Sequence, residues 1–166
     1  MNRIRLAVLI AAFSPLAATA QIPINFGVGA GPTFSTDAEN TGWHAAGYIG
    51  TDFPFFPIGL RLDLVMNEWE LENTDADLRI WSVSGSFLYG MLPNPIVRPY
   101  IVGGLGFYSA KLDVDNATAD NDVGLSAGAG IRFRAGRLRF LTEARYHRIF
   151  NDAETDYIPV TLGLIF

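Results

Sequence analysis

Apolar residues alternate with polar or small residues in eight segments of the chain, which turn-forming or acidic stretches separate. The segments are Ile24–Phe34, Gly42–Phe53, Ile58–Trp69, Asp77–Met91, Arg98–Leu112, Asp122–Arg134, Leu138–Phe150 and Tyr157–Phe166. Strands of soluble proteins have about five or six residues, whereas a strand that crosses a membrane at a tilt needs about nine to eleven. Every segment meets the longer standard. The pattern therefore predicts eight membrane-spanning strands.

The two faces of these segments differ in chemistry, as the third segment shows. One face carries Leu60, Leu62, Leu64 and Met66, and the other carries Gly59, Arg61, Asp63 and Asn67. The interior of an eight-stranded barrel is already crowded with side chains, so the large apolar face cannot point inward. We expect apolar side chains to contact lipid, with glycines and charges in the lumen. The predicted fold is all-β: an eight-stranded antiparallel up-and-down transmembrane β-barrel.

Composition indicates an exported chain and excludes several kinds of site. Residues 1–20 have the positive start, short apolar centre and small-residue end, Ala18-Thr19-Ala20, of a secretory signal. We expect cleavage there and one barrel domain over residues 21–166. The chain has no cysteine, which excludes disulfides and thiolate metal sites. No apolar stretch after residue 20 is long enough for a spanning helix, although 49% of the chain is hydrophobic.

Acidic residues gather in alternate breaks between the segments. In or next to the breaks after the first, third, fifth and seventh segments lie 14 of the 17 carboxylates. The other breaks are rich in proline or glycine, with arginines nearby. Outer-membrane barrels have short periplasmic turns and longer extracellular loops. We therefore expect the acidic end to face outside and both termini to lie in the periplasm.

Charged side chains also occupy inward positions of three segments. They are Arg61, Asp63, Arg132, Glu143, Arg145 and His147. An unpaired ion in a narrow lumen is very costly, so we expect opposite charges to pair there. We interpret the group as a salt-bridged plug that holds the barrel shut. The alternative is a small gated pore in which the pairs exchange partners; eight strands are too few for the open channel of a general porin.

No catalytic, metal or cofactor site is predicted. His147 lies on the same strand face as Glu143, and Ser126 on the adjacent segment is the only mild candidate for a nucleophile. Two alanines follow His44, and the glycine-rich stretches lack the GxGxxG spacing of a nucleotide site. The stretch Asp113–Asp122 lacks a required ligand and the glycine of an EF-hand. We expect a solvated acidic loop there, and loose sharing of cations with lipid phosphates stays open.

Three stretches are similar to parts of a known family: Arg98–Tyr108, Gly124–Phe133 and Glu143–Phe150. They resemble segments of the small eight-stranded outer-membrane barrels of the OmpA and OmpX type. The resemblance implies the outer membrane of a Gram-negative bacterium, and it specifies architecture better than function. Because the sequence stops at Phe166, the peptidoglycan-binding domain of OmpA-type proteins is not expected.

The last segment resembles the carboxy-terminal signal that the bacterial barrel assembly machinery recognises. The residues that carry this resemblance are Tyr157, Leu162, Gly163, Leu164 and Phe166. The resemblance implies the assembly machinery as a partner during biogenesis, and outer-membrane lipids and lipopolysaccharide around a folded monomer. Without the two arginines of residues 1–20 the net charge is −7, which disfavours nucleic acid as a partner.

Aromatic residues gather toward the two ends of the segments. Trp43, Trp69, Trp81, Tyr108 and Phe150 lie toward the acidic end, and Phe53, Phe55, Phe56, Tyr89, Tyr100, Phe140 and Phe166 toward the other. We expect two interfacial belts; the alternative is the core of a soluble lipocalin-like carrier. The predicted function is structural or surface-interactive, through membrane integrity or through adhesion and defence by the acidic loops, without enzymatic activity. The alternative function is a narrow conduit for ions or small apolar solutes.

Overall fold

The structure is a computed structural model that describes residues 23–35, 41–53, 55–70, 77–92, 96–112, 120–150 and 155–166. The expected signal, residues 1–20, lies outside these ranges. The strands are β1 (Ile24–Ser35), β2 (Thr41–Asp52), β3 (Ile58–Glu70), β4 (Asp77–Gly90), β5 (Val97–Leu112), β6 (Asp120–Ala135), β7 (Leu138–Ile149) and β8 (Asp156–Ile165). Each predicted segment corresponds to one strand, and the ends agree to within two residues.

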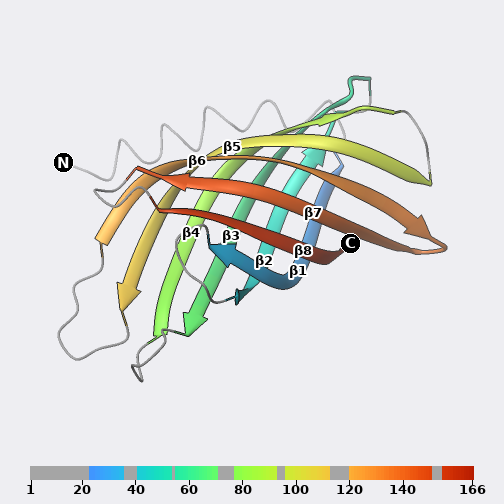
Figure 1. The fold of residues 1–166 in the computed structure, drawn as a ribbon. Helices are drawn as coiled ribbons and strands as arrows, with labels where there is room; N and C mark the ends of the chain where they lie inside the picture. The colour runs from blue at the N-terminus through green and yellow to red at the C-terminus, as the bar shows by residue number, and fades with distance from the viewer. Residues whose placement is uncertain are drawn as a thin grey trace, which may run out of the picture.

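The eight strands form one closed antiparallel barrel in sequence order, with β8 lying between β7 and β1 (Figure 1). The ladder of β1 with β8 extends along β1 from Ser35 to Gly27. Phe26 and Phe166 add reciprocal backbone hydrogen bonds of 2.7 and 3.3 Å. Closure matters because each unpaired backbone group facing lipid costs several kcal/mol.

The barrel wall is apolar outside and polar inside, as β3 shows. Leu60, Leu62 and Leu64 keep 50–51% of their surface exposed on the outer face. Arg61 and Asp63, which alternate with them, are only 7% and 4% exposed. The inverted barrel predicted from the alternation is confirmed. Within the described ranges, no helix has the length and apolar character to span a membrane.

Three aromatic residues predicted for the interfacial belts lie inside the barrel instead. Trp69, Tyr100 and Tyr108 are 2–4% exposed, because they occupy inward positions of β3 and β5. Neighbouring glycines provide the room: a Cβ on Gly130 would collide with the Tyr100 hydroxyl, and one on Gly124 with the Tyr108 ring. The belt residues that are exposed on the outer face or in the turns are Trp43, Trp81, Phe150, Phe55, Phe56, Tyr89 and Phe166.

Buried side chains form two hydrophobic clusters in the lumen. We call the end with the β2–β3, β4–β5 and β6–β7 connections the turn end, and the opposite end the loop end. The loop half holds a hydrophobic cluster of Trp69, Ile80, Tyr108, Ile149 and Tyr157. Toward the turn end, Leu88, Tyr100 and Val102 pack together. Most acidic residues of the loop end lie outside the described side chains; Glu68, which is described, pairs with Arg79 at 2.7 Å.

Candidate functional site

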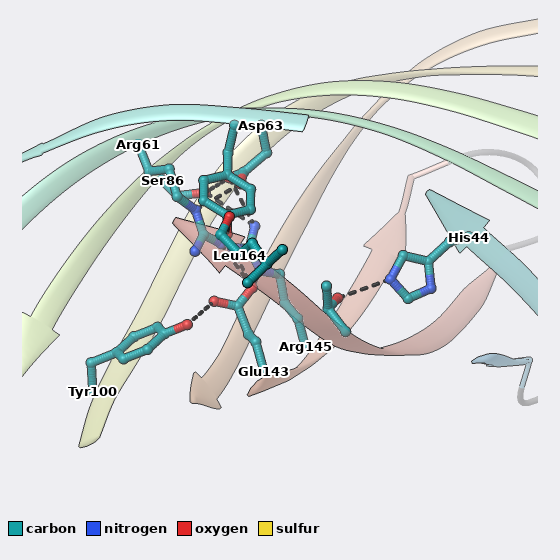
Figure 2. Close-up of polar contacts among 10 residues, drawn as sticks. His44, Arg61, Asp63, Ser86, Tyr100, Glu143, Arg145 and Leu164 are labelled. Carbon is teal, nitrogen blue, oxygen red and sulfur yellow. Dashed lines mark hydrogen bonds and ion pairs between the residues drawn. The ribbon is translucent and has the colours of Figure 1, made fainter. Parts of the chain in front are cut away.

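Two arginines and two carboxylates form a closed ionic network in the lumen (Figure 2). Arg61 lies 2.7 Å from a carboxylate oxygen of Asp63 and 2.7 Å from one of Glu143. Arg145 lies 3.3 Å from Asp63 and 2.9 Å from Glu143. Each arginine therefore contacts both carboxylates, and the four formal charges cancel. We call these four residues the ionic network.

Strand geometry brings the ionic network together from opposite walls. Residues two apart on a strand share a face, which places Arg61 beside Asp63 on β3 and Glu143 beside Arg145 on β7. In the closed order of eight strands, β3 and β7 stand opposite each other. The contacts between their side chains therefore cross the lumen and join the two walls.

Two hydroxyl groups add hydrogen bonds to the carboxylates of the ionic network. Tyr100 donates to Oε2 of Glu143 at 2.6 Å, and Ser86 donates to Oδ2 of Asp63 at 2.8 Å. Nη1 of Arg145 donates to Oγ of Ser86 at 3.1 Å. All four ionised residues are only 4–7% exposed. Buried charges are tolerated when such additional hydrogen bonds satisfy their remaining donors and acceptors.

Little free space remains beside the ionic network. The adjoining cavity has a volume of about 30 Å³, and its lining includes the network together with His44, His147 and Thr161. A cavity needs roughly 10–15 Å³ to hold one water molecule. This cavity therefore accommodates about two water molecules.

Arg132, which the sequence groups with these charges, lies apart from them toward the turn end. Its Nη1 donates to both carboxylate oxygens of Asp52 at 2.8 Å. Its guanidinium carbon lies 5.0 Å from the centre of the Tyr100 ring. The single group expected from the sequence is thus divided, because Asp52 at the end of β2 supplies a separate partner at this level of the lumen.

His147 packs against the hydrophobic cluster of the loop half and lines the small cavity beside the ionic network. Its Nδ1 is 2.9 Å from the hydroxyl of Tyr108. Its ring stacks on Tyr157, with centroids 4.8 Å apart and planes inclined by 7°. With 3% of its surface exposed, His147 is a hydrogen-bonded packing residue of the lumen.

A second buried polar group was missed in the sequence. Nδ1 of His44 lies 3.0 Å from Oγ1 of Thr33, and Nε2 lies 2.9 Å from Oγ1 of Thr161. The Thr33 hydroxyl donates to Oδ1 of Asn67 at 3.1 Å. These residues come from β1, β2, β3 and β8, so the group bridges the closure of the barrel. Alternation predicts that each points inward, but not that they share one level.

Neither histidine forms a hydrolytic triad. Ser126 lies opposite His147 in the register of β6 and β7, but its Oγ is buried without a hydrogen-bond partner. His44 contacts Thr161, but its other nitrogen faces the Thr33 hydroxyl, where a triad needs an orienting group such as a carboxylate. Among the described residues, no group of three or more His, Cys, Asp or Glu could hold a metal ion.

The residues of the expected assembly signal alternate between the two faces of β8. Leu162 and Phe166 are each 63% exposed on the outside, whereas Tyr157 is buried. The main-chain oxygen of Leu164 accepts a hydrogen bond from Tyr48 at 3.0 Å. At Gly163 an added Cβ would lie 3.1 Å from the same hydroxyl. This placement suits a strand that closes a barrel, and recognition by the assembly machinery stays a prediction.

Comparison with known proteins shows the family of this chain. Neisserial surface protein A is similar in structure, with a TM-score of 0.73 at 14% identity over 86% of this chain and 95% of that one. Ail, the attachment invasion locus protein of Yersinia pestis, has a TM-score of 0.60 at 18% identity over 89% and 100%. The outer membrane enzyme PagL has 0.55 at 15% over 86% and 98%.

Identities this low show a shared fold alone. The chain matches no curated protein sequence. The outer membrane protein beta-barrel domain, however, matches residues 4–166, nearly the whole chain. The chain belongs to the outer membrane protein beta-barrel domain family.

Proposed function

We propose that this protein is a non-catalytic outer-membrane barrel with a sealed lumen, which acts at the cell surface through membrane integrity or through contacts of its acidic loops. The ionic network carries the proposal. Its four residues cross the lumen between β3 and β7 and are almost entirely buried. Arg61 and Arg145 each contact both carboxylates of the network. Displacing one side chain to open a path for ions through the lumen would therefore break several charged contacts at once.

The small cavity beside the ionic network supports a sealed barrel over the alternative of a narrow conduit. A volume of about 30 Å³ leaves no room for a hydrated ion to pass the arginines without rearrangement. The observation therefore favours a structural role for the lumen and leaves the outer rim as the surface for partners.

Two structural relatives have names that support a role at the surface. One is called a surface protein, and the other an attachment invasion locus protein, which has also been solved with the heparin analogue sucrose octasulfate. We extend to this chain only the surface role. Its acidic breaks repel a polyanion of that kind, so a partner of the loop end is expected to carry positive charge or bridging cations.

PagL demonstrates that an enzyme has this fold. The two histidines of this chain favour a different conclusion, because His44 and His147 are only 1% and 3% exposed inside the barrel. A membrane lipid meets the outer wall, where no histidine of the described residues is exposed. We therefore propose that the barrel performs no lipid chemistry.

Planar-bilayer recordings of the refolded protein test the sealed lumen. We expect no steady current from the native chain. Glu143→Ala leaves two arginines with Asp63 alone and is expected to produce flickering openings. A steady ion current through the unaltered barrel would instead support the conduit.

Epitope tags test the proposed orientation. A tag between Asp115 and Asn116 is expected to bind antibody on intact cells, whereas a tag at Gly136 in the β6–β7 turn is expected to require permeabilised cells. The reverse pattern would place the acidic loops in the periplasm and remove the proposed surface role.

A further inference from the structure

The turn end of the lumen contains a cavity with a strongly basic lining. It has a volume of about 80 Å³ and is lined by residues of every strand except β4. Its charged lining, apart from Arg61 of the ionic network, is Arg98, Arg132, Arg134, Arg139 and Asp52. We call these five residues the basic mouth. Four arginines thus face one carboxylate.

The register of the strands places like charges opposite each other in the basic mouth. Arg98 of β5 pairs with Arg132 of β6, and Arg134 of β6 pairs with Arg139 of β7. Like charges directly opposite on neighbouring strands are destabilising. Two such pairs on consecutive ladders concentrate positive charge at one place in the wall.

The partners of Arg132 and Arg139 within the protein balance only one of their two positive charges. Asp52 binds Arg132 through both oxygens at 2.8 Å. Arg139 donates to the neutral side-chain oxygen of Asn25 at 2.7 Å. Arg61 also lines the cavity, but its charge is already matched by Asp63 and Glu143.

One donor of the basic mouth has no acceptor in the protein. Nε of Arg132 is buried without a hydrogen-bond partner, although its Nη1 is bound to Asp52. The guanidinium is held in place from one side by the ring of Tyr100, 5.0 Å away. A guanidinium that is held in place in the wall of a cavity is suited to bind an oxyanion through its accessible N–H groups.

We propose that the basic mouth binds a phosphate group. The planar fork of arginine matches tetrahedral oxyanions, and a doubly charged phosphate offsets the charge excess better than a monovalent ion. A cavity of about 80 Å³ suits a small headgroup and not a large polyanion. Two sources have this chemistry: free phosphate, and the phosphate of a lipid headgroup in the adjacent leaflet.

Thermal unfolding in the presence of phosphate tests the proposal. The full chain is folded in neutral detergent micelles, and sodium phosphate is titrated while sodium chloride keeps the ionic strength constant. A ligand that binds only the folded barrel raises the unfolding midpoint with its concentration. We expect a saturable rise with phosphate. A rise that matched ionic strength in chloride reproduces equally would overturn the proposal.

Three arginine variants distinguish the site from general surface charge. Arg134→Gln and Arg139→Gln are expected to weaken phosphate binding at least tenfold. Arg137→Gln is the matched control, because Arg137 is exposed in the same β6–β7 turn but does not line the cavity. Equal loss in R137Q would overturn the proposal.

The unfolding midpoint measured without phosphate distinguishes a misfolded variant from one that has lost phosphate binding. Removing one arginine of the Arg134–Arg139 pair relieves repulsion, so R134Q and R139Q are expected to unfold at the native temperature or above it without phosphate. A lowered baseline with an unchanged phosphate response would show that these arginines only stabilise the wall, and it would overturn the proposal.

A second titration with phosphatidic acid in the micelles identifies the source of the phosphate. A response to either ligand that R134Q and R139Q abolish supports the site. A response to the lipid alone assigns it to a headgroup, and a response to inorganic phosphate assigns it to a soluble anion. Failure of both titrations would overturn the proposal.

Discussion

The ionic network and the basic mouth lie close together in the lumen but differ in their balance of positive and negative side chains. In the ionic network two arginines meet two carboxylates, and the residues are 4–7% exposed. In the basic mouth four arginines and one carboxylate line a cavity, and Arg98 and Arg134 are exposed. Where water is excluded, the chain balances every charge; where water has access, the excess is screened.

Tyr100 connects the two regions. Its hydroxyl donates to Glu143 of the ionic network, and its ring lies against Arg132 of the basic mouth. The two regions therefore share a residue, and their different charge balance follows from how deeply the charges are buried in the lumen. Substitutions in the ionic network are therefore expected to cost stability at any salt concentration, whereas those in the basic mouth are expected to cost little and to depend on salt.

Glu143→Ala is expected to have the largest effect. It leaves Arg61 and Arg145 buried with only Asp63 between them, and removing one partner of a buried ion pair costs about 3–5 kcal/mol. Urea unfolding of the barrel in phospholipid bilayers measures the loss. The control is Glu68→Ala, because its partner Arg79 is 41% exposed and such pairs contribute about 0–1 kcal/mol. Equal losses in the two variants would remove the distinction by depth.

A double-mutant cycle on Arg61 and Glu143 measures the coupling across the lumen directly. Their side chains meet at 2.7 Å, and contacting residues in one network show couplings of about 0.5–3 kcal/mol. Arg61→Leu combined with Glu143→Leu is expected to destabilise the barrel less than the two single losses added together. The same cycle on Arg79 and Glu68 should give a smaller coupling. Additive losses for Arg61 and Glu143 would mean that the contact does not join the two walls.

The fold was predictable because alternation with period two is a local property of the chain. The positions of Arg61, Asp63, Glu143 and Arg145 on inward faces follow from their neighbours on one strand. The prediction that Tyr100 lies in an interfacial belt was wrong. It rested on the position of Tyr100 near the end of a strand and not on the alternation, which places this residue on the inward face. The alternation, together with Gly130 on the neighbouring strand, is the signal that places it inside.

The partners within the lumen were not predictable in the same way. Arg61 and Glu143 are 82 positions apart, and they meet because β3 and β7 stand opposite each other at a particular stagger. Alternation gives the face of a residue but not its height in the barrel, which depends on how the register shifts around all eight strands. For this reason the sequence did not show that Arg132 pairs with Asp52 toward the turn end, whereas His147, two residues beyond Arg145 on β7, does line the small cavity beside the ionic network.

Tyr100→Phe is expected to have an intermediate effect. It removes the 2.6 Å hydrogen bond to Glu143 and keeps the ring against Arg132. Hydrogen bonds to charged groups contribute about 1.5–3 kcal/mol, so the urea midpoint should fall by less than in Glu143→Ala. Tyr48→Phe is a matched control, since its hydroxyl donates to the neutral main-chain oxygen of Leu164 at 3.0 Å. A loss no larger than in the control would indicate that Tyr100 adds nothing to the charged contacts.

Asp52→Asn is expected to have the smallest effect on stability and the most informative dependence on salt. Asp52 and Arg132 keep 39% and 23% of their side-chain surfaces exposed, so losing the pair costs about 0–1 kcal/mol. The substitution increases the positive charge of the basic mouth, and raising sodium chloride from about 0.01 to 1 M shortens the Debye length from about 30 to 3 Å. The deficit of Asp52→Asn in urea unfolding should therefore shrink with salt, while that of Glu143→Ala should stay constant. A loss of stability that is insensitive to salt in both variants would mean that the basic mouth is as shielded from water as the ionic network. The different charge balance of the two regions would then have to be explained by geometry instead of by exposure.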